Sequence, residues 1–186
     1  YRVATNSKIV EALIEAAENG KDVVVLVELR ARFDEENNIE WSRRLEEAGC
    51  RIIYGLDNLK VHSKLCLITR KIGNSISYIT QVGTGNYNAS SAKIYTDLGL
   101  FTARDDICSD VQDLFNVMTG FGVIDNYRRI FVSPNHLRAN ITRLIREEAE
   151  IHRAKGGGRI IMKCNQLVDQ GIVRELYEAS RAGVKS

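Results

Sequence analysis

Apolar positions in the first 54 residues switch between helical and strand-like spacing. After Asn6 and Ser7, either of which can cap a helix, apolar residues recur three or four positions apart until Gly20. The continuous apolar run Val23–Leu29 predicts a strand buried on both faces of a parallel sheet. The expected inward positions of the first helix are Ile9, Val10, Leu13, Ile14 and Ala17.

A second helix and a short strand follow. Asp34-Glu35-Glu36 places negative charge where a helix would begin, and Gly49 stops the helical pattern. Arg51–Tyr54 then predicts a second strand. The residues expected to face inward from this second helix are Ile39, Trp41, Leu45 and Ala48.

The middle of the chain predicts three strands and a helix. Lys64–Thr69 and Ile76–Val82 are strands around the turn Lys71–Asn74, and Asp97–Thr102 is a third. Asp105–Met118 has helical spacing. Strands that alternate with helices indicate an α/β domain with a mixed sheet. The apolar face of the last helix comprises Val111, Leu114, Phe115 and Met118.

The remaining residues predict two further helices and one strand. Pro134 begins a long helix that reaches about Ala154, and Gly156–Gly158 breaks the pattern. Arg159–Cys164 predicts a strand, and Val168–Arg181 predicts an amphipathic helix.

Two helices share a sequence pattern. Leu13–Gly20 aligns with Leu176–Gly183 at an offset of 163 residues (176 − 13), which favours two similar α/β domains. The alternative is coincidence, because Ala/Glu-rich amphipathic helices often end in Gly. The predicted division is a first domain over 1–130, a helical connector and Gly-rich break over 131–158, and the truncated start of a second domain over 159–186.

Composition narrows the function classes. A net charge of +2 without a Lys/Arg block does not predict a nucleic-acid partner. The four cysteines show no CxxC or CxxH spacing, so we do not expect a zinc site. We expect the cysteines to be reduced thiols in a cytosolic protein. The apolar run Val23–Val27 is too short to span a membrane.

One set of residues suits phosphoryl transfer. His62 supplies an imidazole nucleophile, and Lys64, two positions later, supplies positive charge. Gly83-Thr84-Gly85-Asn86 forms a turn whose backbone N–H groups can approach phosphate oxygens. Taken singly, these residues also fit a surface histidine, a solvated lysine and an Asn placed for a hairpin turn.

Arginines and a tyrosine are further candidates. Arg30 and Arg32 follow the Val23–Leu29 strand, at the edge where open α/β sheets bind ligands, and a guanidinium can grip two phosphate oxygens. Arg32 also has acidic residues close by with which it could pair. Arg2 precedes the first helix. Tyr95 could donate to a phosphate or simply pack. We assign no role to Glu28 or Asp97, although either could orient a basic neighbour.

His62-x-Lys64 followed by Gly83-Thr84-Gly85-Asn86 resembles one half of the phospholipase D-like fold, whose motif is HxKxxxxD followed by a GSxN-like turn. Thr69 stands at the Asp position of that motif. This departure argues against a phosphodiesterase.

Longer segments resemble the polyphosphate kinase family across essentially the whole chain. They are Val27–Ile39, Gly55-Leu56 through Leu59–Leu65, Gly83–Asn88, Tyr95–Leu98, Val132–Pro134 and Asn165–Asp169. The resemblance implies an α/β, phospholipase D-like mixed sheet flanked by helices. It also implies reversible transfer of the terminal phosphate of ATP to inorganic polyphosphate through a phosphohistidine.

The resemblance assigns roles to residues. His62 becomes the phosphorylated nucleophile, with Lys64 and Tyr95 catalytic and Lys64, Asn86 and Arg30 binding phosphate. Arg2 and Arg32 become the magnesium/phosphate-site arginines. It further implies Mg²⁺, ATP/ADP and polyphosphate as ligands, a homo-oligomer, and a cytoplasmic protein with peripheral membrane association.

Two other functions fit the residues. One is a phospholipase D-like nuclease or lipid hydrolase, in which His62 forms a transient phosphodiester intermediate. The other is a non-catalytic module that binds polyanions. The chain runs from Tyr1 to Ser186, and neither end looks natural. We therefore expect a fragment that is inactive, or nearly so, by itself.

Overall fold

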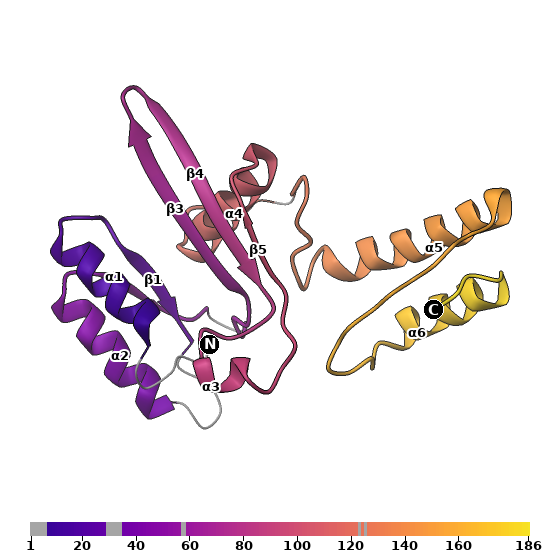
Figure 1. The fold of residues 1–186 in the computed structure, drawn as a ribbon, viewed down its shortest axis with the longest axis horizontal. Coiled ribbons are helices and arrows are strands. Elements are labelled where there is room, and N and C mark those ends of the chain that lie inside the picture. The colour runs from indigo at the N-terminus through magenta and orange to yellow at the C-terminus, as the bar shows by residue number, and fades with distance from the viewer. Residues whose placement is uncertain (1–6, 29–34, 57–58, 123, 125) are drawn as a thin grey trace. The chain divides into compact units, whose positions relative to one another are not determined.

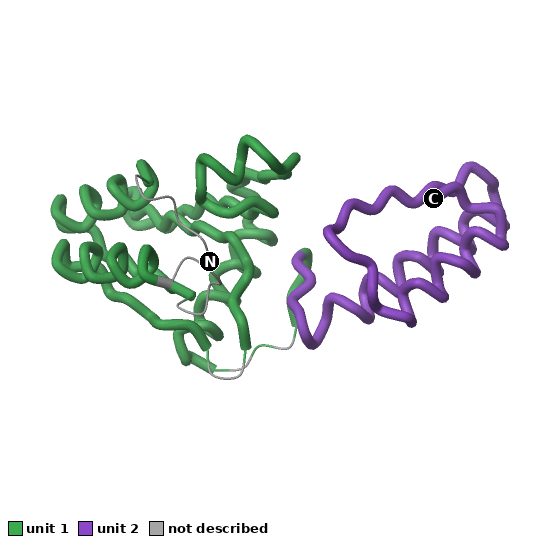
Figure 2. The backbone as a smooth tube through the Cα atoms, turned by 90° about the horizontal axis from the view of Figure 1, so that it is seen from below, with its two compact units in different colours: residues 1–129 green, residues 130–186 purple. Residues whose placement is uncertain are grey.

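The computed structural model describes residues 7–28, 35–56, 59–122, 124 and 126–186. The chain divides into two compact units, Tyr1–Arg129 and Ile130–Ser186 (Figure 1, Figure 2). No helix within the described ranges is both long enough and apolar enough to cross a bilayer.

The first unit begins with two helices that pack on a parallel strand pair. Helix α1 (Lys8–Glu18) starts at Ser7, whose hydroxyl accepts the N–H of Val10 at 3.4 Å, which confirms the predicted cap. Strand β1 (Val24–Val27) pairs with β2 (Arg51–Tyr54), and α2 (Glu35–Glu47) lies between them in sequence. The buried core of this part is Val10, Val23, Trp41, Leu45 and Cys50.

Three residues of this part that were predicted to be buried are exposed. Ile9 and Ile39 are 47% and 54% exposed, and Val24 on β1 is 37% exposed. In α2 the buried stripe instead uses Asn38 and Ser42, with Trp41 and Leu45, because these polar side chains find hydrogen-bond acceptors. Val23, just before β1, and Val25 pack on the helix-covered core, which leaves Val24 on the opposite face.

An antiparallel sheet follows. Strands β3 (Lys64–Ile72) and β4 (Ser75–Gly83) form a long hairpin, and β5 (Gly99–Thr102) pairs with β4. The strands run further than predicted, because Gly73 takes φ +61° and the turn closes in two residues rather than four. Helix α4 (Asp105–Met118) has the predicted bounds and packs against β3 and β4.

The second unit is a pair of helices. Helix α5 (Leu137–Lys155) and α6 (Gln170–Arg181) bury Ile145, Ala149, Ala179 and Val184 between them. The predicted strand Arg159–Cys164 is wrong: only Arg159 is bridged, to Lys185, and Ile160 N–H donates to the Lys185 carbonyl at 2.8 Å. A strand needs a neighbour along its length, and the described residues of this unit supply only that short contact.

The two similar helices end in the same way. Lys21 N–H bonds to the Ala16 carbonyl, and Val184 N–H bonds to that of Ala179, 163 residues further on (179 − 16). However, α2 and α4 end with the equivalent bond as well. This C-terminal motif is common to helices of this chain, so the duplication stays a prediction.

The turn after β4 is fastened to the start of β5. Thr84 N–H bonds to the Leu98 carbonyl at 3.0 Å, and the Thr84 hydroxyl donates to Asp97 Oδ1 at 3.0 Å. The Asp97 carboxylate also fills the space beside Gly85, where a Cβ would lie 2.6 Å from Asp97 Cγ. Because Asp97 is engaged with the turn, β5 starts at Gly99 and not at the predicted Asp97.

A buried carboxylate ties the end of the first unit to α4. Asp110 is fully buried, and its two oxygens accept the backbone N–H groups of Arg128 and Arg129 at 2.9 and 2.6 Å. Nearby, Asp106 pairs with Arg104 and Arg129, whose guanidinium groups hold the pKa of that carboxyl far below its usual range. Residues 128–129 are thus fixed by charge-assisted hydrogen bonds.

We expect Asp110→Ala to release this segment. Two backbone N–H groups lose the buried carboxylate that accepts them, which should cost about 2–4 kcal/mol locally. Hydrogen exchange at the Arg128 and Arg129 amides should accelerate at least tenfold. Asp113→Ala is the matched control, because Asp113 lies on the same helix and only reaches Arg128 at 3.9 Å. Equal exchange rates in the two variants would contradict this account.

We also expect Gly85→Ala to distort the turn, since the new methyl group would overlap the Asp97 carboxylate. The amides of Thr84 and Leu98 should then exchange faster. Gly99→Ala is the control: a Cβ at Gly99 would meet only Gln81 Nε2, at 3.8 Å. Unchanged protection in Gly85→Ala would show that the turn does not depend on this close approach.

Candidate functional site

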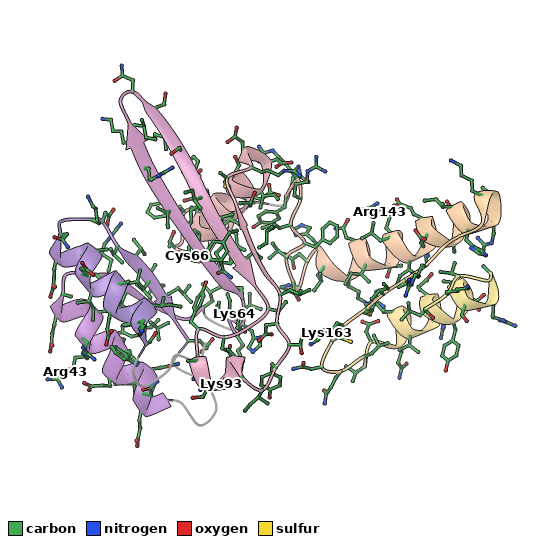
Figure 3. All side chains as sticks on the ribbon, viewed as in Figure 1. Arg43, Lys64, Cys66, Lys93, Arg143 and Lys163 are labelled. Carbon is green, nitrogen blue, oxygen red and sulfur yellow. The ribbon has the colours of Figure 1, made fainter. Side chains whose placement is uncertain are left out.

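The strand register brings the two halves of the sequence motif together. Lys64, the first residue of β3, lies opposite Gly83, the last residue of β4, and Gly83 in turn lies opposite Gly99. Lys64 therefore lies beside the Gly83–Asn86 turn, at the end of β3 farthest from the hairpin turn at Gly73-Asn74 (Figure 3). His62 precedes the strand by two residues, so the imidazole, the lysine and the turn share one end of the sheet.

His62 and Lys64 are in direct contact. Lys64 Nζ lies 3.0 Å from His62 Nδ1 and donates to the His62 carbonyl oxygen at 2.5 Å. The lysine is buried, with 4% of its surface exposed, whereas the histidine is exposed. The arrangement leaves Nε2 as the ring nitrogen that Lys64 does not engage.

The surroundings of Lys64 weaken its hold on a proton. Burial lowers the pKa of its ammonium group to about 8, against the opposing attraction of the Asp97 carboxylate. Near neutral pH the ammonium is still charged but poorly hydrated. A cation in that condition gains more from an incoming anion than a fully solvated one does.

The polar residues of the turn divide into two kinds. Asn88 caps α3 (Ala89–Ala92), its Oδ1 accepting the N–H groups of Ser90 and Ser91 at 3.1 and 3.0 Å, so its role is structural. Asn86 Oδ1 is buried, and no hydrogen-bond partner for it occurs among the described residues. An ionised phosphate oxygen only accepts hydrogen bonds, so a phosphate would bind the Nδ2 donors of this amide and not Oδ1.

Tyr95 lies just after α3 and is 60% exposed. Its backbone N–H bonds to the Ser91 carbonyl at 3.1 Å, which fixes the chain but not the phenol. The side chain is therefore exposed to solvent. It does not pack in a core, which was the alternative to phosphate binding that the sequence allowed.

The three predicted arginines, Arg2, Arg30 and Arg32, lie outside the described residues. The last described residue before two of them is Glu28, which is 3% exposed. Glu28 Oε2 accepts the backbone N–H of Val61 at 2.9 Å. The carboxylate thus contacts the residue that precedes His62.

Sequence reasoning missed one polar pair beside Lys64. Gln81 lies opposite Cys66, on the face of the sheet that Lys64 shares, and its Oε1 accepts the Tyr87 hydroxyl at 2.5 Å. Burial, with a smaller contribution from Cys66, raises the pKa of Tyr87 to about 12. The alternation of side chains along β4 could have placed Gln81 on this face of the sheet. It could not have shown that Gln81 is hydrogen-bonded to Tyr87.

The described residues offer no ready set of ligands for a magnesium ion held by the protein alone. Among them, no three His, Cys, Asp or Glu side chains gather closely enough to hold a metal. The predicted pair Arg2 and Arg32 cannot ligate one either, because a guanidinium only donates hydrogen bonds and Mg²⁺ takes oxygen ligands. A guanidinium group binds phosphate oxygens instead.

Two family models match the chain: Polyphosphate kinase C-terminal domain 1 over residues 1–124, and Polyphosphate kinase C-terminal domain 2 over residues 130–186. The polyphosphate kinase of Staphylococcus epidermidis is 48% identical over 185 residues, and that of Synechocystis sp. is 50% identical over 186 residues. Each match takes in the whole of this chain, which spans about a quarter (25%) of each relative's length.

A solved structure agrees with these matches. The crystal structure of polyphosphate kinase from Porphyromonas gingivalis, at 42% identity, is similar to this chain with a TM-score of 0.84. The likeness covers 99% of this chain and 31% of that one, and it confirms the predicted α/β, phospholipase D-like class. With one family model over more than half of its residues, this chain belongs to the polyphosphate kinase family.

Proposed function

We propose that this chain carries the phosphate-accepting histidine of an enzyme that moves the terminal phosphate of ATP onto inorganic polyphosphate. The observation that carries the proposal is the contact of exposed His62 with buried Lys64, 3.0 Å apart, beside the Gly83–Asn86 turn. Family membership supplies the substrate class. The chain spans a quarter (25%) of its relatives' length, so we assign it this part of the active site and not the whole.

The reaction has two balanced steps. In the first, an imidazole nitrogen attacks the γ-phosphorus of ATP, an N–P bond forms, and the bond to the bridging oxygen breaks as ADP takes the electron pair. In the second, a terminal oxygen of polyphosphate attacks the same phosphorus. The N–P bond then breaks, the imidazole is restored and the chain is one phosphate longer.

We assign the attack to Nε2 of His62, because Lys64 engages Nδ1. Nε2 has a lone pair only when the proton of the neutral ring sits on Nδ1. Lys64 must therefore stop donating to Nδ1 before attack. A bound phosphate, which is a better acceptor for an ammonium group than imidazole, provides the means.

The turn and its neighbours complete the site. Backbone N–H groups of Gly85 and Asn86 and the Nδ2 donor of Asn86 stabilise negative charge on the transferred group, and the exposed phenol of Tyr95 can donate to it. Arg2, Arg30 and Arg32 stay predicted phosphate ligands. We treat magnesium as the ion that ATP carries, and no step above depends on a protein-held metal.

Thr69 does not decide between a kinase and a phosphodiesterase. It is an exposed residue of β3 opposite Tyr78, five positions beyond Lys64 (69 − 64). At about 3.3 Å per residue it lies roughly 17 Å from Lys64 along the strand, too far to act on His62. Family membership favours the kinase. Homo-oligomer formation, cytoplasmic location and peripheral membrane association stay predictions.

We expect His62→Ala to abolish phosphoenzyme formation in the full-length protein that contains this chain. Incubation with ATP labelled on the γ-phosphate should leave an acid-labile, alkali-stable label on the wild type and none on the variant. His152→Ala is the control, since His152 only accepts the Gly158 N–H in the second unit. Labelling that survives in His62→Ala overturns the proposal. Salt-sensitive polyphosphate binding with no label on the wild type identifies a polyanion-binding module instead.

The lowered pKa of Lys64 predicts the pH dependence. The ammonium is charged below about 8 and loses its charge as pH rises through that value, so kcat/KM for ATP should fall above pH 8. Lys64→Arg, which keeps a charge, should move that fall to higher pH even if its rate is lower. If kcat/KM instead rises through pH 8, the neutral amine is the working form, as a proton acceptor for Nδ1.

A further inference from the structure

Strand β1 is followed by a buried carboxylate, that of Glu28. Glu28 is 3% exposed, and Oε2 accepts the Val61 N–H at 2.9 Å, across 33 residues of sequence (61 − 28). A buried carboxylate is tolerated only where hydrogen bonds replace its water. The contact to Val61 is one of those bonds, and it lies next to the nucleophile in sequence.

The backbone of Glu28 is also held. Asn38 of α2, which is 1% exposed, donates from Nδ2 to the Glu28 carbonyl oxygen at 2.9 Å. On the other side, Gly55 takes φ +61°, and a Cβ there would lie 3.8 Å from Glu28 Oε1. The backbone of Glu28 is therefore held in place and its carboxyl group lies against Gly55. Both contacts restrict where the carboxylate, and with it the Val61 N–H group, can lie.

The segment that carries His62 precedes β3. Residues 60–63 belong to no strand, whereas Lys64 is held by the β3–β4 ladder. The Glu28–Val61 bond supplies the second fixed point, so His62 lies between two anchored residues. Arg30 and Arg32 follow Glu28 in sequence. The Glu28 carboxylate thus connects the end of β1 to the chain that reaches His62.

We propose that Glu28 is a positioning residue for His62: it holds the Val61 N–H and thereby aims the imidazole at the phosphate bound beside Lys64. The proposal rests on the function assigned above. Removing the anchor should lower kcat and leave KM for ATP nearly unchanged, because Lys64 and the glycine turn still bind phosphate. A displacement of about 1 Å at a nucleophile can reduce the rate of reaction about 100-fold.

The test compares Glu28→Ala, Glu28→Asp and Glu28→Gln in the full-length enzyme. Ala removes the acceptor, Asp is one methylene too short, and Gln keeps an oxygen at the same reach. We expect single-turnover phosphorylation of His62 to slow 10-fold to 100-fold in Ala and Asp and to stay within about threefold of wild type in Gln. Exchange at the Val61 amide should rise in the first two variants only.

Asp110→Asn is the matched control, because Asp110 is an equally buried carboxylate that accepts backbone N–H groups far along the chain from His62. It should alter stability without altering the phosphorylation rate per active site, measured by burst titration. If Glu28→Ala does not fold, the comparison of Glu28→Asp with Glu28→Gln tests the positioning role. Wild-type rates in Glu28→Asp, or an equal loss in Asp and Gln, overturn the inference. Loss of the label in His62→Ala with normal rates in Glu28→Asp would leave the proposed function standing and remove only this role.

Discussion

The register of the β3–β4 hairpin is the constraint on which the rest of the site depends. It sets Lys64 opposite Gly83, and so joins a His-x-Lys element to a glycine turn that comes about twenty residues later. A slip of one residue would turn Lys64 to the other face of the sheet and move the turn away from it. The two-residue turn at Gly73-Asn74 fixes this register, because a longer loop would change the residue pairing at the far end.

Three buried charges organise the irregular parts of the first unit in the same way. Lys64 donates to the His62 carbonyl, Glu28 accepts the Val61 N–H, and Asp110 accepts from Arg128 and Arg129. In each case a desolvated charge binds the backbone of a segment outside the strands. Such bonds are stronger than those between neutral groups, and losing one leaves a charge without compensation. The loops are therefore positioned by electrostatics where the ladders end.

The sequence predicts the elements well where apolar periodicity alone decides them, and less well where polar groups are buried. Helix α4 and strand β2 have the predicted bounds, because their patterns are long or flanked by clear stops. Ile39 was expected inside α2, yet Asn38 takes that place, since its amide bonds to Glu28. Among site residues, His62 and Lys64 follow from a motif. The roles of Glu28 and Asp97 depend on contacts with residues 61 and 84–85, which no local pattern encodes.

The buried lysine links stability to binding. Burial lowers its pKa from 10.5 to about 8, so the fold disfavours the charged form near pH 7. The folded state binds fewer protons than the unfolded state between these two values, and the contribution of Lys64 to stability therefore rises with pH from about 8 to 10.5. A phosphate beside the ammonium reverses part of that penalty, because an opposite charge raises the pKa again. By reciprocity, the same energy favours phosphate binding to the protonated form, and this is the physical basis of anion selectivity at the proposed phosphate site.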